Sequence, residues 1–155
     1  MNENNQIELL QHKIKILELE IEHYKSQIEK LKQNEKKYRL FFEKSQDPFL
    51  LIKNFRFIDC NQAALKILKI ESFNELLDTH PSAISPEYQP DGKLSTLKAN
   101  EMMNLALTKG HHSFDWMHKA NDGSLFLVRV SLTPIVIDNE LIIFTHWTPS
   151  ETKNK

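Results

Sequence analysis

Isoleucine recurs at every seventh position near the start of the chain, and this spacing constrains the fold more than any other feature. Another large side chain follows three residues after each isoleucine, so the two sets occupy positions a and d of a heptad repeat. No glycine or proline interrupts the pattern before Pro48. It predicts a coiled-coil dimerisation helix over residues 1–45, and Ile at a with Leu at d favours two parallel strands. The predicted seam consists of Ile7, Leu10, Ile14, Leu17, Ile21, Tyr24, Ile28 and Leu31.

The length of this helix bears on what covers the seam. At about 1.5 Å per residue, about 40 residues span roughly 60 Å, which exceeds the reach of a domain of about 110 residues. We therefore favour a second copy of the chain as the partner over packing on the chain's own domain. A weaker apolar stripe leaves a four-helix assembly or a different partner helix open, and it consists of Leu9, Ile16 and Leu19.

The rest of the chain has the pattern of short strands, helices and then longer strands. Turn residues and β-forming side chains predict two strands between residues 49 and 60 and three more between 112 and 148. Helical patterns lie between them, at 62–69 and 94–109. This order predicts an α+β domain over 46–149, with a five-stranded antiparallel sheet that carries its helices on one face.

Capping residues predict where these helices begin and end. Asn61 has the position of an N-cap, and Ser72 begins a capping box. Gly110 follows the second helix, as a C-terminal stop does. Ser85 followed by Pro86 predicts one further helix start.

Composition narrows the possible partners and environment. The formal net charge is −1, which gives no reason to expect a nucleic-acid partner. Cys60 is the only cysteine, so no intrachain disulfide forms, which fits a reducing compartment. No apolar run approaches the roughly 18 residues that cross a membrane, and the polar N-terminus lacks a signal core. We expect a cytoplasmic protein with no membrane partner, whose residues 150–155 form a disordered tail.

Four phrases occur in an order that is similar to a known family: Tyr38 to Glu43 before Asp47-Pro48, Asp59 to Ala64, Phe114 to Trp116, and Asn121-Asp122-Gly123. Residues 36–149 resemble the PAS domain family. The resemblance implies a PAS-like fold and a sensor module of the kind found beside histidine kinases, diguanylate cyclases and chemotaxis receptors. Such domains usually end in Asp-x-Thr, where this chain has His146-Trp147-Thr148. We therefore expect the signal to leave through the N-terminal helix or by docking to another protein.

A pocket between the 94–109 helix and the sheet is the predicted ligand site. Met is adaptable in shape, and Trp116 and His118 carry N–H groups that orient a ligand or bond to the backbone. A filled core without ligand is the alternative. The pocket candidates are Met102, Met103, Leu107, Phe114, Trp116, His118, Val128, Val130 and Phe144.

The sequence gives little support for metal, cofactor or catalytic chemistry. His112 and His118 lie about 20 Å apart along one strand and on the face opposite His111, so they do not share a metal ion. The resemblance implies haem only with a histidine on the 94–109 helix, which has none, and a flavin adduct only with an Asn-Cys-Arg phrase, whereas Asn61 follows Cys60. We expect no metal, no cofactor and no catalytic residue, and a buried hydrophobic role for Cys60.

These features predict a non-enzymatic PAS sensory or regulatory module in signal transduction. We expect a homodimer formed by a parallel coiled coil, which senses a small apolar ligand or a partner protein. The alternative is a ligand-free dimerisation adaptor that docks onto a histidine kinase, cyclase or chemoreceptor.

Overall fold

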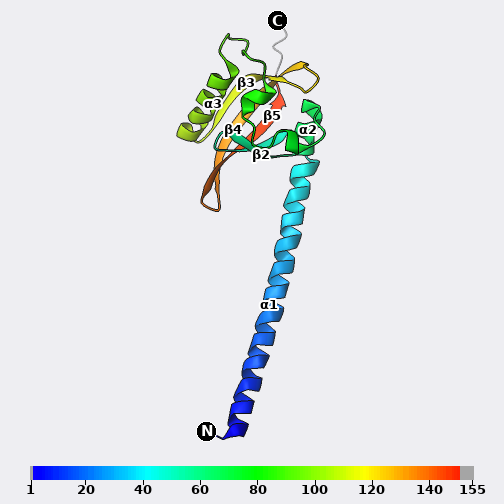
Figure 1. Ribbon diagram of the computed structural model, residues 1–155, viewed down its shortest axis with the longest axis vertical. Helices are drawn as coiled ribbons and strands as arrows, with labels where there is room; N and C mark the ends of the chain where they lie inside the picture. The colour runs from blue at the N-terminus through cyan, green and yellow to red at the C-terminus, as the bar shows by residue number, and fades with distance from the viewer. Residues whose placement is uncertain (1, 151–155) are drawn as a thin grey trace. The chain divides into compact units, whose positions relative to one another are not determined.

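The computed structural model describes residues 2–150, and the chain divides into a first unit ending at Phe41 and a second beginning at Phe42 (Figure 1). The predicted tail lies outside the described residues except for Ser150. The elements are α1 (Glu3–Lys44), β1 (Phe49–Lys53), β2 (Arg56–Cys60), α2 (Gln62–Leu68), the 3₁₀-helices η1 (Phe73–Glu75) and η2 (Pro81–Ile84), α3 (Ser95–Lys109), β3 (His112–Lys119), β4 (Leu125–Ile137) and β5 (Glu140–Pro149).

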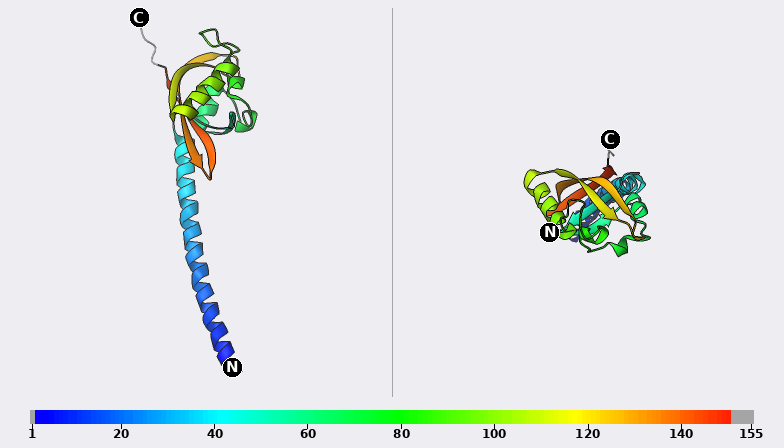
Figure 2. Two further views of the ribbon diagram at one scale, coloured as in Figure 1. Left: turned by 90° about the vertical axis from the view of Figure 1, so that its left-hand side faces the viewer. Right: turned by 90° about the horizontal axis from the view of Figure 1, so that it is seen from above.

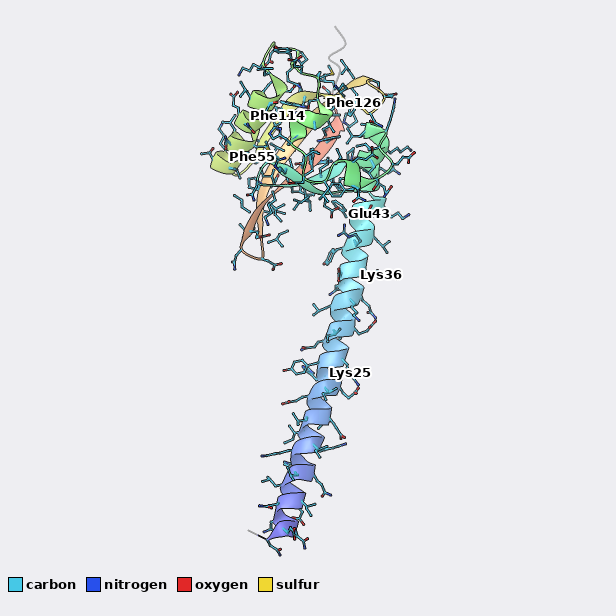
Figure 3. The ribbon with its side chains drawn as sticks, viewed as in Figure 1. Lys25, Lys36, Glu43, Phe55, Phe114 and Phe126 are labelled. Atoms are coloured by element: carbon cyan, nitrogen blue, oxygen red, sulfur yellow. The ribbon has the colours of Figure 1, made fainter. Side chains whose placement is uncertain are left out.

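Helix α1 runs for 42 residues, and none of them is buried. The eight predicted seam residues are each 50–68% exposed in the single chain. Charged side chains pair along the helix surface, for example Lys25 Nζ with Glu22 Oε1 at 2.9 Å. Lys25 and Lys36 are labelled on this helix in Figure 3. Within residues 2–150, no helix combines the length and the apolar character needed to cross a membrane.

The second unit contains one five-stranded antiparallel sheet in the order β2-β1-β5-β4-β3. Helices α2 and α3 lie on one face of it (Figure 2). The α+β architecture with helices on one face is therefore confirmed. Because side chains alternate along a strand, each strand presents one set of residues to the helices and the other set to the opposite face.

Most of the predicted caps are confirmed. Asn61 caps α2, Ser72 forms the capping box of η1, and Gly110 ends α3 with φ +79°. The helix predicted after Ser85 is wrong, because residues 85–94 form an irregular segment with one bridge between Tyr88 and Leu94. Ser85 instead follows η2, whose N-cap is His80.

Asn61 ties the start of the domain to the sheet and is completely buried. Its Oδ1 accepts from the backbone N–H of Phe49 and of Ala64, at 3.0 and 3.1 Å. Its Nδ2 donates to the carbonyls of Phe42 and Asp47, both at 2.9 Å. These bonds use the two acceptor sites and both donors of the amide group. One side chain thereby fixes the last turn of α1, the segment after it and the first turn of α2.

The core lies between the helices and the face of the sheet that they cover. It is built from strand residues such as Leu50 and Val130 and from helix residues such as Leu68 and Ala106, all buried. Two partly buried phenylalanines, Phe114 on β3 and Phe126 on β4, pack against this core and are labelled in Figure 3.

Candidate functional site

A small cavity lies between α3, η2 and the helix-covered face of the sheet. Its volume is about 40 Å³. One water needs about 10–15 Å³ of such space, so the cavity has room for more than one. Five of the predicted pocket residues line it: Met103, Phe114, Trp116, His118 and Val130.

The other four candidates lie elsewhere. Met102 and Val128 are buried in the core without lining the cavity. Leu107 is 36% exposed on α3. Phe144 lies on the opposite face of the sheet, where its ring is 5.1 Å from that of Phe49. Its neighbour along β5, Thr145, is the residue that faces the helices and lines the cavity.

Seven further residues complete the lining, and the sequence patterns above do not place them in the pocket. Pro81 of η2 and Ala99 of α3 close the cavity opposite the sheet, and Phe57 lies on the edge strand β2. Strand pairing would have identified the strand residues, because paired residues share one face of the sheet. Leu50 of β1 pairs with Thr145, so Thr145 faces the helices with it. The strand residues are Ile52, Leu132, Thr145 and Trp147.

His118 is the most deeply buried ionisable group of the site, with 4% of its surface exposed. Its Nδ1 lies 3.1 Å from the carbonyl oxygen of Ile84, and its ring lies 4.0 Å from that of Trp147, centroid to centroid. Burial lowers the pKa of this imidazole to about 3, against a smaller opposing effect of the bond to Ile84. His118 is therefore neutral at physiological pH.

Two polar atoms of the lining have no hydrogen-bond partner among the described residues: His118 Nε2 and Thr145 Oγ1. Thr145 is only 3% exposed, so bulk water does not readily compensate for the missing bond. A buried polar atom left without a partner costs about 1–3 kcal/mol. Two such atoms in one cavity indicate a site built for contents with hydrogen-bonding groups.

Trp116 differs from His118 because its polar group is already used. Its Nε1–H donates to Ser85 Oγ at 3.0 Å, and Ser85 Oγ donates to the carbonyl of Pro81 at 3.1 Å. The N–H of Trp116 thus fixes the segment after η2 and is not free to orient a ligand.

Gln89 holds the irregular segment 85–94 against β3. Its Oε1 accepts from the backbone N–H of Met117 at 2.9 Å, and its Nε2 donates to the carbonyl of Met117 at 3.1 Å and to Ser95 Oγ at 2.9 Å. The side chain is buried, so these bonds replace the ladder bonds of an edge strand away from water. The segment is therefore anchored beside the strand that supplies three of the lining residues.

The lining contains no aspartate, glutamate, lysine or arginine. No group of three His, Cys, Asp or Glu side chains suited to a metal ion occurs within residues 2–150. Cys60 is buried, and burial, with smaller effects of Asp59 and Glu43, raises the pKa of its thiol to about 12. The thiol therefore stays protonated, as expected for a small buried side chain.

Comparisons with known proteins agree with this architecture. The PAS domain family matches residues 46–146. No curated protein sequence matches the chain significantly.

Solved PAS domains share the fold at low sequence identity. One from a two-component sensor histidine kinase has a TM-score of 0.62 at 15% identity, covering 76% of this chain and 96% of that one. The PAS domain of an HTR-like protein from Haloarcula marismortui has a TM-score of 0.63 at 15% identity, covering 80% and 98%. The PAS domain of nitrogen regulation protein NR(II) from Vibrio parahaemolyticus has a TM-score of 0.56 at 12% identity, covering 70% and 94%.

Proposed function

Because the chain belongs to the PAS domain family, we propose that it is a non-enzymatic sensor module of a signalling protein, which binds a small molecule in the cavity beneath α3 and dimerises through α1. The proposal of a ligand rests on two buried polar atoms that have no partner within residues 2–150, His118 Nε2 and Thr145 Oγ1. A core evolved only to be filled would place apolar groups at both positions, since these remove the cost of the missing bonds.

The heptad stripe supports α1 as the dimerisation element and the output. Its large apolar side chains are exposed in the single chain, and pairing would bury them at a gain of about 1.5–3 kcal/mol for each one fully covered. Asn61 bonds to the carbonyl of Phe42, in the last turn of α1. A change in the core therefore has a short covalent and hydrogen-bonded route to the helix, where it would act as a rotation or register shift between two copies.

The second candidate is a ligand-free dimerisation adaptor that docks onto a histidine kinase, cyclase or chemoreceptor. The β4–β5 hairpin favours it, because Val136 and Leu141 near its tip are 70% and 50% exposed. Exposed apolar side chains grouped on a hairpin suit a protein partner. In this case the cavity holds water alone.

A methyl NMR experiment separates these two functions. Met103 lines the cavity, whereas Met117 alternates to the other face of β3 and serves as an internal reference. Adding a panel of small acids, amines, alcohols and heterocycles should shift the Met103 methyl signal saturably and leave that of Met117 unchanged. If no compound in the panel shifts the Met103 signal, the result would support the ligand-free adaptor.

Matched variants secure the assignment. Ala99→Leu places three more carbon atoms at a buried lining position and should abolish the shift. Ala63→Leu, on α2 and away from the cavity lining, should preserve it. An equal response in both variants would place the binding outside the cavity.

A further inference from the structure

The tautomer of His118 is fixed by its surroundings. A carbonyl oxygen only accepts hydrogen bonds, so Nδ1, which faces the carbonyl of Ile84, must carry the proton. In the neutral ring Nε2 is then an acceptor with a free lone pair. Nothing in the described part of the chain donates to it. The cavity therefore presents an acceptor that requires an O–H or N–H from its contents.

Thr145 supplies a second polar group at a separate part of the lining, because Leu132 pairs with both His112 and Thr145, which places Thr145 six residues along β3 from His118. Its hydroxyl both donates and accepts, rotates to suit its partner, and has no protein partner in the described chain. Apart from His118 and Thr145, the lining side chains are apolar except Trp116, whose N–H donates to Ser85. Beside His118 the contents of the cavity thus meet one acceptor and an otherwise apolar wall.

Charge and size restrict the contents further. No formal charge lies in the lining to balance that of an ion, and moving an unpaired ion out of water is strongly unfavourable. The bare Nε2 lone pair adds repulsion toward an anion. A volume of about 40 Å³ admits roughly three or four non-hydrogen atoms, if one water-sized atom needs about 10–15 Å³.

We propose that the cavity binds a small uncharged alcohol, whose hydroxyl donates to His118 Nε2 while its carbon atoms contact the apolar wall. This inference rests on the proposed small-molecule sensor and specifies the chemical class of its ligand. The ligand must therefore donate a hydrogen bond, and both cations and anions are excluded.

Four three-carbon compounds test this class: 1-propanol, acetone, propionate and propylammonium, each titrated while the Met103 and Met117 methyl signals are followed. 1-Propanol should shift Met103 saturably. Acetone, which accepts but does not donate, should bind about two- to tenfold more weakly, the range that one neutral hydrogen bond supports. The two ions should give no saturable shift.

Three variants assign the contacts. His118→Phe keeps a flat ring but removes Nε2, so it should weaken 1-propanol binding about two- to tenfold. Thr145→Val keeps the shape but removes a hydroxyl that lies six residues along the sheet from His118, so it should weaken 1-propanol binding less. Acetone should lose nothing in His118→Phe, because it makes no bond to Nε2. Thr148→Val, on the face of β5 opposite to Thr145, should leave both titrations unchanged. If His118→Phe fails to fold, the comparison of 1-propanol with acetone in the unaltered protein still tests the donor requirement.

Each outcome bears on a different claim. If acids or amines from the broader panel shift Met103 and 1-propanol does not, the alcohol class is overturned while the sensor function stands. If acetone binds as well as 1-propanol, the donor requirement is overturned. If no compound shifts Met103, the cavity holds water alone, and both the alcohol and the small-molecule sensor fall.

Discussion

His118 differs from the other buried polar side chains of this domain in what its second polar atom meets. Asn61 forms four hydrogen bonds and Gln89 forms three, so each amide uses its oxygen and its nitrogen, and Trp116 uses its single N–H. His118 uses Nδ1 alone. Burial disfavours the charged form of this imidazole, so the residue stays neutral in the folded protein. This preference makes the stability of the domain depend on pH.

We expect His118 to make the domain less stable as the pH falls below about 6.5. Its folded pKa of about 3 lies below the ordinary value of 6.5, so between these values the unfolded chain binds more protons than the folded one. Stability then rises with pH in this window and is lost on acidification. From pH 7 to pH 5 the loss amounts to about 2 kcal/mol, measured as the free energy of unfolding in urea.

His118→Phe provides the comparison, because the other six histidines remain in it. The difference between the two pH slopes isolates the buried imidazole, whatever the variant does to overall stability. Parallel slopes in the two proteins would show that His118 is protonated in the folded state at pH 5.

At the scale of elements, local chemistry predicted the parts with strong periodicity and failed where tertiary bonds decide. The helix ended by Gly110 and the strands that follow it have patterns which propensity alone supports. The segment after Ser85 does not. Pro86 suits a helix start, but its carbonyl accepts from Ser95 of α3, and Gln89 accepts from the backbone of β3 instead.

The candidate site shows the same limit. β5 is apolar on both faces, so alternation alone did not distinguish Phe144 from Thr145 as the one that faces the helices. Pairing with Leu50 of β1 settles the face, and pairing is a long-range property. Leu107 lies on α3 but is partly exposed, since a helix covers the cavity with only part of its circumference.

Gln89→Ala should loosen the segment 85–94 without unfolding the domain. The change removes an acceptor and two donor bonds and leaves the N–H of Met117 without its partner, at a cost of about 2 kcal/mol. Hydrogen exchange followed by mass spectrometry should show faster exchange in peptides from this segment and at Met117. Gln62→Ala, at an exposed position of α2, is the control. Unchanged exchange in Gln89→Ala would mean that the backbone alone holds the segment.

At the scale of the whole molecule, the long helix is the element whose partner decides how the protein works. Its seam residues are exposed in one chain, and its second stripe, Leu9, Ile16 and Leu19, is exposed as well. Two stripes of unequal strength on one helix raise the question of which one pairs.

Substitution on each stripe answers this by sedimentation. Ile14→Asp with Ile21→Asp should convert dimers to monomers, because each change places a charge in the buried seam. Ile16→Asp with Leu19→Asp adds the same charge outside the seam and should leave the dimer intact. Loss of association in the second variant alone would assign the interface to the weaker stripe, and loss of half the subunits there would indicate a four-helix assembly.

The hydrogen bonds of Asn61 also limit which amino acids can replace it during evolution. The position demands two acceptor sites and two donors on one short planar side chain. No other amino acid reachable from an asparagine codon by one base change offers that set: aspartate lacks the donors, lysine lacks the acceptors, isoleucine lacks both, and serine, threonine, histidine and tyrosine each have too few. Every single-base change that replaces this asparagine therefore breaks hydrogen bonds between the end of α1 and the sheet, whatever happens at the surrounding positions.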